Sequence, residues 1–398
     1  MKFNESSLYN IQSSVLGERR SLYELANWKN GIAFKKINFS DTGVPVIKIA
    51  ELNNGIGGTT AYTQQIFSED VHLKRGDLLF SWSGNPQTSI DIFRFKLEEG
   101  WLNQHIFKIT PYEEIVDRDF FYFLMKNLKP YFTQIAINKQ TTGLGHVTIA
   151  DIKKISIVIP SLDLQREIVS YIKPIDDKIE LNNEINNNLE QQAIAMYKNR
   201  FINIEQDNGN LPQSWKKGTV SDVIEIHDSK RIPLSSRERA ELDKIYPYYG
   251  ATSIMDYVDK YLFDGIYLLL GEDGTVIDDN GHPILQYVEG KFWVNNHAHI
   301  LTGKNGFSVE MLYLLFKLTN VKSIVTGAVQ LKISQANLKS IPIIIPSTEE
   351  LETVNQIIQP IFAQIRNLRS ENESLSTLRD SLLPKLMSGE LDVSEIDL

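Results

Sequence analysis

The chain of 398 residues contains no cysteine. Disulfides, thiolate metal sites and cysteine nucleophiles are therefore excluded. There is no run of about 18 apolar residues, which a transmembrane helix requires. Residues 1–12, MKFNESSLYNIQ, lack the apolar core of a signal peptide. By elimination, we expect a soluble protein of the cytoplasm.

Sequence motifs for catalysis are also missing. No strand is followed by a glycine fingerprint for S-adenosylmethionine or a dinucleotide, and there is no GxxxxGK[ST] phosphate loop or GxSxG elbow. Residues 85–88, NPQT, are weakly similar to the NPP(Y/F) loop of adenine methyltransferases. They lack the second proline and the aromatic that stacks on an extruded base. We expect no catalytic residue and no cofactor bound by this chain.

Three segments contain metal-ligand residue types without a convincing ligand pattern. Glu272 and Asp273 lie between glycines, which is typical of a tight turn. Residues 277–283 miss the spacing of a calcium loop and its terminal glutamate. His297 and His299 share one face of a predicted strand, but no third zinc ligand is evident. The sequence therefore predicts no metal site.

The net charge of −9 is unevenly distributed. Residues 1–160 carry 18 basic and 16 acidic side chains, and residues 211–346 carry 14 and 15. Residues 161–210 carry 5 and 9, and residues 347–398 carry 4 and 10, so these two segments sum to −4 and −6. The near-neutral regions can present a local basic face to DNA, whereas the acidic segments suit solvent or a protein partner.

The sequence repeats itself with a period of about 186 residues. ISIVIPS at 155–161 matches IPIIIPS at 341–347, and the two copies then continue without a gap. This alignment pairs Ile172 with Ile358, Pro174 with Pro360, Ile179 with Ile365 and Asn186 with Asn372. Further upstream, WLNQHIFKI at 101–109 resembles WVNNHAHIL at 293–301. One unit, consisting of a domain and a helix, has been duplicated; the period is too long for a solenoid.

Each copy ends in a predicted amphipathic helix of coiled-coil type, because apolar residues recur at spacings of three and four. Ser161 and Ser347 are candidate N-caps, Gly389 is a candidate C-terminal stop, and Pro174 and Pro360 should kink or split the helices. The narrow stripe favours antiparallel pairing of the two helices over packing of each onto its own domain. The predicted helix–helix interface comprises Ile175, Ile179, Ile185, Leu189, Ile361, Ile365, Leu368, Leu375 and Leu382.

Short β-rich segments separated by glycine, Asp and Asn dominate the remaining sequence. The predicted strands lie at 44–52, 76–84, 105–110, 154–160, 220–228, 246–253, 265–274 and 297–303, and the predicted helices lie at 117–129 and 307–320. We therefore expect an α+β fold with two similar, mainly antiparallel-sheet domains, separated by two long antiparallel helices in a pseudo-two-fold repeat. The expected parts are a first α+β domain (1–159), a first helical spacer (160–205), a second α+β domain (206–345) and a second helical spacer (346–398).

Direct reading of DNA requires side chains that reach base edges and others that hold phosphates. Two duplicated loops at 138–148 and 322–332 contain glycine, polar donors and nearby bases, and residues 229–239 form a basic cluster. A solvated loop is the alternative for any single residue. The candidate DNA-binding residues are Lys35, Lys36, Trp82, Gln87, Arg94, Lys139, Gln140, Thr142, His146, Lys230, Arg231, Arg237, Arg239, Thr326, Gln330 and Lys332.

Residues 229–274, beginning SKRIPLSSRER, are similar to the second recognition domain of the specificity subunits of type I restriction-modification systems. Residues 28–56 are similar to the opening of such a domain, and the resemblance covers almost the whole chain. Residues 211–223, LPQSWKKGTVSDV, resemble the linker between them. The two helices that begin at Ile-Pro resemble the conserved regions of the family.

The resemblance implies that each domain reads one half of a split, asymmetric double-stranded DNA site. It also implies that the helices act as a ruler and dock two methyltransferase subunits, while restriction subunits join for cleavage. S-adenosylmethionine, ATP and Mg²⁺ would then be bound only by the partners. The alternatives are a specificity subunit of another restriction class with a fused methyltransferase-nuclease partner, a self-contained methyltransferase or nuclease, and a coiled-coil scaffold.

Overall fold

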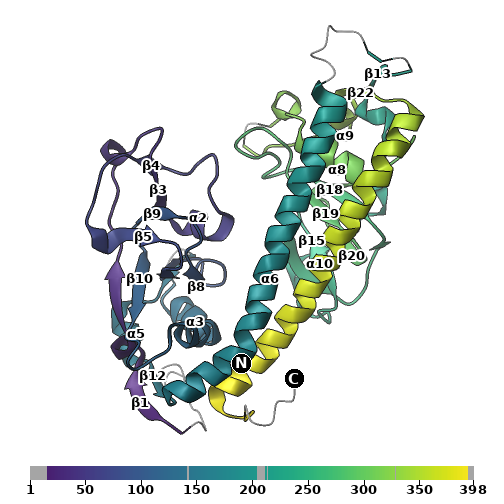
Figure 1. Cartoon of the computed structure of the whole chain (residues 1–398). Coiled ribbons are helices and arrows are strands. Elements are labelled where there is room, and N and C mark those ends of the chain that lie inside the picture. The colour runs from purple at the N-terminus through teal and green to yellow at the C-terminus, as the bar shows by residue number, and fades with distance from the viewer. Residues whose placement is uncertain (1–15, 141–142, 204–210, 213, 328, 393–398) are drawn as a thin grey trace. The chain divides into compact units, whose positions relative to one another are not determined.

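The computed structural model describes residues 16–140, 143–203, 211–212, 214–327 and 329–392. The chain divides into two compact units (Figure 1). Unit 1 comprises residues 1–181 and 371–398, and unit 2 comprises residues 182–370. Each unit therefore contains one α+β domain together with one segment of each long helix.

The domain of unit 1 is built on two four-stranded sheets with the orders β2-β10-β6-β8 and β4-β3-β9-β5. Every strand pair is antiparallel except β3 with β9. The strands β1 and β12 pair separately, as do β7 and β11. The elements are β1 Glu18–Ser21, β2 Ala26–Asn30, β3 Val44–Ile47, α2 Ile49–Asn54, β4 Tyr62–Thr63, β5 His72–Lys74, β6 Leu78–Ser81, β7 Ser83–Gly84, β8 Asp91–Arg94, β9 Glu99–Leu102, β10 Ile106–Pro111, α3 Arg118–Asn127, α4 Lys129–Asn138, β11 Gly145–His146, α5 Ile149–Lys154 and β12 Ser156–Ile159.

The domain of unit 2 repeats this plan, with sheets of order β14-β21-β18-β19 and β16-β15-β20-β17 and a separate β13–β22 pair. The only parallel pair among its named strands is β15 with β20. The elements are β13 Lys216–Thr219, β14 Ile224–Ile226, α7 Ser236–Ala240, β15 Tyr246–Tyr249, β16 Ile254–Val258, β17 Phe263–Asp264, β18 Tyr267–Gly271, β19 Leu285–Val288, β20 Lys291–Val294, β21 Ala298–Gly303, α8 Val309–Lys317, α9 Gln335–Lys339 and β22 Pro342–Ile345.

Backbone pairing confirms the duplication residue by residue. Trp101 pairs in parallel with Val46, and Trp293 pairs in parallel with Tyr248. Just beyond these pairs the backbone hydrogen bonds are again the same. The Asn103 N–H donates to the carbonyl of Ile47 (3.1 Å), and the Asn295 N–H donates to that of Tyr249 (3.0 Å). The predicted pairing of the two WxN segments is therefore confirmed.

One predicted strand was too long. Residues 49–52 were expected to continue a strand, but they lie in α2. The Lys48 N–H donates to the Glu51 carboxylate (3.0 Å), which caps the first turn, and Gly55 ends the helix with a φ of +77°. Local capping therefore outweighed the apolar alternation. In unit 2, β15 likewise ends at Tyr249 rather than continuing to residue 253.

The two long helices are α6, Leu162–Tyr197, and α10, Thr348–Ser388. Both run without interruption through the prolines predicted to kink or split them, so the short-helix alternative is wrong. The Ser161 hydroxyl accepts from the Leu164 N–H (3.4 Å), and the Ser347 hydroxyl accepts from the Glu350 N–H (3.2 Å), which confirms both N-caps. Gly389, with a φ of +73°, follows the end of α10 as predicted. No helix in the described ranges combines the length and apolar character needed to cross a membrane.

Within each unit the segments of α6 and α10 pair in antiparallel orientation. In unit 1, Asp176 forms an ion pair with Arg379 (2.9 Å), and three residues later Ile179 accepts a hydrogen bond through its carbonyl from Asn372 (3.4 Å). The residue numbers of the α10 partners therefore fall as those of α6 rise, which is the signature of an antiparallel pair. In unit 2, Arg200, in a π-helical turn directly after α6, pairs with Glu350 near the start of α10 (3.0 Å between Nη2 and Oε2).

Both helices also contribute to the core of each domain. In unit 1, Ile168 and Ile172 of α6 share one hydrophobic cluster with Leu383 and Leu386 of α10 and with the aromatic side chains of α3. In unit 2, the corresponding cluster contains Ala193, Tyr197, Ile358, Phe362 and Ile365 together with α8. Helix pairing and domain packing therefore occur together, whereas the stripe width had suggested a helical partner alone.

The predicted helix–helix residues are buried to different extents. Ile365 and Leu368 are buried, whereas Ile185 is 36% exposed. The others are half-buried, namely Ile175, Ile179, Leu189, Ile361, Leu375 and Leu382. Ile172 and Ile358, which share hydrophobic clusters with the domains, are fully buried, but they were not among the predicted interface residues.

Ile172 and Ile358 occupy equivalent positions, one in each unit, and both are fully buried. We predict that Ile172→Ala and Ile358→Ala each reduce the free energy of unfolding of their own unit by about 2–4 kcal/mol, because each substitution leaves a cavity. Hydrogen exchange resolved by peptide would localise each loss to one unit. Ile185→Ala is the exposed control, and an equal effect of all three substitutions would contradict the packing.

Candidate nucleic-acid interface

The two predicted recognition loops leave the same point of the repeated scaffold. In unit 1, β7 pairs with β11, so that Ser83 lies opposite His146. In unit 2, Asp273 bridges Lys332 in the same way. The next backbone bonds also match, because the Val147 N–H donates to the Trp82 carbonyl and the Ile333 N–H donates to the Glu272 carbonyl, both at 2.8 Å. His146 and Lys332 are thus equivalent.

In the loop of unit 1, the candidate side chains differ in their availability. Lys139 forms an ion pair with the buried carboxylate of Asp151 (2.5 Å), which also accepts from Thr148 at the start of α5. Burial works to raise the pKa of Asp151, but these bonds hold it below its usual value. Lys139 therefore anchors the loop. Gln140 is exposed and His146 is half-buried. Thr142 lies outside the described residues.

The other candidate residues of unit 1 also divide into exposed side chains and side chains that are bonded within the fold. Lys35, Lys36 and Gln87 are exposed. Trp82 is half-buried: its indole N–H donates to the Asn30 side chain (2.9 Å). The side chain of Arg94 is only 18% exposed, and it pairs with Asp119 at 3.0 Å. Arg94 therefore has a structural role, whereas the exposed residues stay candidates for contact with DNA.

In unit 2, the basic cluster separates into surface and structural residues. Lys230 and Arg237 are exposed. Arg231 pairs with Glu272 (2.6 Å) and its side chain is 13% exposed. Arg239 is 8% exposed, pairs with Asp256 (3.0 Å) and lies over the Tyr248 ring. Arg231 and Arg239 thus stabilise the fold, because their charges are already satisfied internally.

The loop of unit 2 is closed by backbone bonds at its base. The Thr326 N–H donates to the Lys332 carbonyl (2.9 Å), and the Lys332 N–H donates back to that of Thr326 (2.7 Å). Thr326 and Gln330 are exposed, and the Lys332 ammonium lies 3.3 Å from Glu272. Above this fixed base, the described part of the loop presents the exposed Gln330 together with the exposed apolar side chains of Val329 and Leu331.

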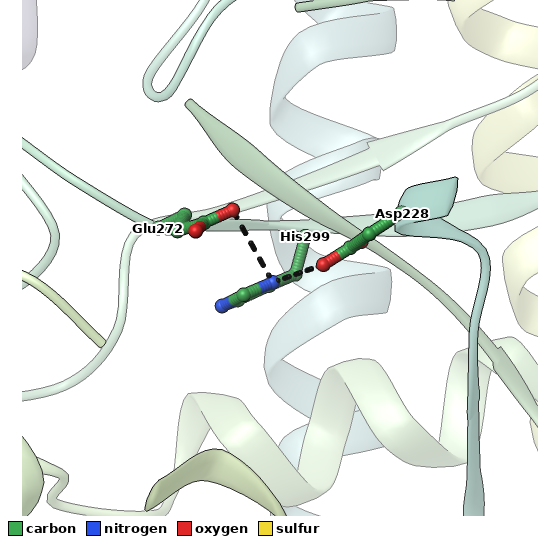
Figure 2. A group of neighbouring side chains, drawn as sticks. All are labelled: Asp228, Glu272 and His299. Carbon is green, nitrogen blue, oxygen red and sulfur yellow. Dashed lines mark hydrogen bonds and ion pairs between the residues drawn. The ribbon is translucent and has the colours of Figure 1, made fainter. Parts of the chain in front are cut away.

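Beneath this loop lies a cluster that the sequence analysis did not assemble: Asp228, Glu272 and His299 (Figure 2). His299 follows Ala298 at the start of β21, and its ring is fully buried between the two carboxylates. Its Nδ1 lies 2.6 Å from Asp228 and 3.6 Å from Glu272. Glu272 and His299 were noticed separately, but Asp228 is more than 40 residues from either in sequence, so no spacing could reveal the group.

The bonds of the cluster favour ion pairing over metal binding. Arg231 contacts both carboxylates, at 2.6 Å from Glu272 and 3.4 Å from Asp228, and so provides the compensating charge that a cation would supply. His299 Nε2 faces the carbonyl of Ile333 (2.8 Å), which only accepts, and Nδ1 faces a carboxylate. Both ring nitrogens therefore already face oxygen partners within the protein, which leaves neither directed at a metal position.

Asp228 is the most heavily bonded member. Besides His299, it accepts hydrogen bonds from Gln335 (2.6 Å) and from the Ile300 N–H (3.0 Å). Burial works to raise its pKa, but the bonds to His299 and Ile300 and the charge of Arg231 hold the pKa below its ordinary value. Asp228 thus ties β21 to the start of α9 and to the loop.

Unit 1 has different chemistry at the same three positions. The strand registers place Asn30, Trp82 and Phe107 where unit 2 has Asp228, Glu272 and His299. There the Trp82 ring stacks on Phe107 with centroids 5.7 Å apart, and its N–H bonds to Asn30. The same structural junction is therefore held by aromatic stacking in one copy and by ion pairs in the other.

Comparison with known proteins decides the family. The family model described as "Type I restriction modification DNA specificity domain" matches residues 17–191 and again residues 212–378. The chain belongs to this family. The two matched segments coincide with the two copies of the repeat, so that the chain contains two DNA specificity domains in tandem.

Individual relatives agree with the family. A putative type I restriction enzyme specificity subunit of Haemophilus influenzae is 33% identical over 149 residues, 37% of each chain. The type I restriction enzyme MjaIX specificity subunit of Methanocaldococcus jannaschii is 26% identical over 326 residues, covering 74% of this chain and 73% of that one. The crystal structure of a type I restriction-modification S subunit from M. genitalium has a TM-score of 0.52 at 16% identity and covers 97% of this chain and 98% of the other, which shows a shared fold.

The family expected from the resemblance is thus confirmed: the chain is a DNA specificity subunit of the type I restriction-modification class. The α+β fold with two similar domains and long paired helices is confirmed as well. A specificity subunit of another restriction class and a self-contained methyltransferase are not favoured.

We predict that Asp228→Asn reduces the free energy of unfolding by about 3 kcal/mol at pH 7, because it leaves His299 and Arg231 without their shared carboxylate. The folded-state pKa of Asp228 lies below its unfolded value, so the ionised carboxylate stabilises the fold fully above pH 3.8. Its contribution is lost as pH falls through the lowered pKa, where variant and wild type should converge.

Chemical denaturation between pH 7 and pH 3 measures this difference, with the exposed Asp243→Asn as the control. A gap between Asp228→Asn and wild type that stayed constant across this range would contradict the proposed role of the carboxylate.

Proposed function

We propose that this chain reads a split, asymmetric double-stranded DNA site, with one half of the site contacted by each of its two domains. The observation that carries the proposal is the pair of loops that leave one shared scaffold with different side chains. At equivalent positions, unit 1 offers His146 and unit 2 offers Lys332. Different donors at the same place favour different bases, because base edges in the major groove present distinct patterns.

The surface side chains support phosphate and base contacts around these loops. Lys35, Lys36, Lys230 and Arg237 are exposed cations, suited to phosphates. Exposed amides, Gln87, Gln140 and Gln330, suit base edges. Under this proposal the half-buried arginines act from within the fold and the exposed residues touch DNA.

The long helices supply the spacing. At 1.5 Å per residue, the 36 residues of α6 extend over about 54 Å. One turn of B-DNA is about 34–36 Å, so a helix of this length is sufficient to hold two readers at half-sites about one turn apart. Continuity through Pro174 supports a stiff spacer rather than a jointed one.

The same helices are the proposed docking surface for two methyltransferase subunits, and restriction subunits complete the complex. Their segments hold the excess acidic charge of the chain, −4 and −6, which suits a protein surface better than phosphate. Under this proposal the chain binds no cofactor itself. S-adenosylmethionine, ATP and Mg²⁺ would act on the partner subunits.

The matched substitutions His146→Ala and Lys332→Ala test the assignment of one domain to each half-site. Each should weaken discrimination at one half of the DNA site only, by about 1–3 kcal/mol, because one set of base contacts is lost. Binding of the chain with its methyltransferase to duplexes mutated in either half measures this. If both substitutions affected the same half, or weakened all sequences equally, the assignment would be overturned.

A further inference from the structure

In each unit, the domain meets the long helices at a small group of equivalent positions. The strand registers place Leu78 opposite Arg94 in unit 1 and Leu268 opposite Tyr287 in unit 2, so that Arg94 and Tyr287 correspond. The N-caps Asp117 and Ser308 align α3 with α8, which makes Asp119 equivalent to Glu310. On the helices, the 186-residue period makes Glu180 equivalent to Arg366.

In unit 1 the domain contributes the positive charge. Arg94 on β8 pairs with Asp119 (3.0 Å) and lies 3.8 Å from Asp176 of α6. Its guanidinium lies over the ring of Tyr122, 4.0 Å from the centroid, and both Arg94 and Asp176 are largely buried. One turn further along α6, Glu180 pairs with Lys96 of the domain (2.8 Å). We call these contacts lock 1.

In unit 2 the charges are reversed. Here the helix carries the cation: Arg366 of α10 forms ion pairs with Glu310 on α8 (3.2 Å) and with Glu289 after β19 (3.1 Å). It also bonds to the hydroxyl of Tyr287, which in turn donates to Glu310 (2.7 Å). Phe362, at the position equivalent to Asp176, packs against the Tyr287 ring with centroids 5.2 Å apart. We call these contacts lock 2.

The reversal makes the two docking surfaces incompatible. If the domain of unit 1 lay on the α10 segment, Arg94 would meet the apolar Phe362 and Lys96 would meet Arg366. If the domain of unit 2 lay on the α6 segment, Glu310 and Glu289 would meet Asp176 and Glu180. Like charges brought together in a half-buried site destabilise the contact, and so does a buried charge without a partner.

We propose that lock 1 and lock 2 fix the orientation of each recognition domain on its own helix segment, through charge pairs that the other copy could not accept. Only residues 160–161 and 346–347 join the last strand of each domain to its helix, so the chain itself brings each domain to its segment. The locks add charge pairs further along the helix, and their opposite signs make the two contact surfaces non-interchangeable. The consequence rests on the proposed function: fixed docking sets which reader stands at which end of the DNA site, and holds one spacing between the half-sites.

The test uses the full chain and hydrogen exchange measured by mass spectrometry. Arg366→Glu should raise exchange in β19 and α8 by at least about tenfold, because it places a carboxylate among carboxylates. The paired reversal Arg366→Glu with Glu310→Lys should restore most of the protection. Arg369→Glu, an exposed arginine three residues further along α10, is the matched control. Equal effects of Arg366→Glu and Arg369→Glu, or no recovery in the paired reversal, would overturn the proposal.

Two further variants keep the test decisive if Arg366→Glu does not fold. Arg366→Met removes the attraction without adding repulsion and should give an intermediate rise in exchange. Glu180→Arg gives α6 the arginine that α10 carries, and should loosen unit 1 by repelling Lys96, with recovery when Lys96→Glu is added. Protection that is unchanged in both variants would overturn the proposal.

Selection of DNA duplexes by the Arg366→Met chain, bound to the methyltransferase, distinguishes failure of the docking proposal from failure of the proposed function. The lock predicts that this variant selects half-sites at more than one spacing where wild type selects one. If hydrogen exchange showed the charge coupling but the variant still selected one spacing between half-sites, the docking role of the locks would stand and their consequence for DNA would be overturned. If wild type selected no motif, the proposed function would fail, and the exchange data alone would judge the lock.

Discussion

Both units depend on the burial of one face of each long helix in a core that neither helix could form by itself. Ile172 of α6 and Leu386 of α10 both belong to the core of unit 1, and Tyr197 of α6 and Phe362 of α10 both belong to the core of unit 2. Fully burying one such side chain stabilises the fold by about 1.5–3 kcal/mol. Each long helix therefore contributes apolar side chains to both cores, one in each unit.

On that common framework, the two copies have kept their backbone and changed their side chains. The bonds that fix the loops, from Val147 to Trp82 and from Ile333 to Glu272, are the same. The side chains below them are aromatic in unit 1 and charged in unit 2. A backbone shared by both copies keeps the readers in comparable positions, while different side chains allow them to recognise different bases.

The sequence could predict the internal repeat and the features that depend on neighbouring residues, such as helix caps. The 186-residue period, the N-caps at Ser161 and Ser347 and the family followed from patterns along the chain and are confirmed, and each predicted strand segment contains a strand, although several are shorter than predicted. The strand expected at 49–52 is a helix, because one glutamate cap outweighs alternation. The pairing of Arg231 with Glu272 and of Arg94 with Asp119 could not be foreseen, because it joins residues distant in sequence. For this reason several cations expected on the surface hold the fold instead.

The central claim is that two dissimilar readers are held at a fixed spacing by one shared helical framework. Selection from a random duplex library by the unaltered chain, bound to its methyltransferase subunits, tests it most directly. The account predicts enrichment of two different short motifs separated by a gap of constant length and free sequence. One contiguous motif, two identical half-motifs or a gap of variable length would contradict it.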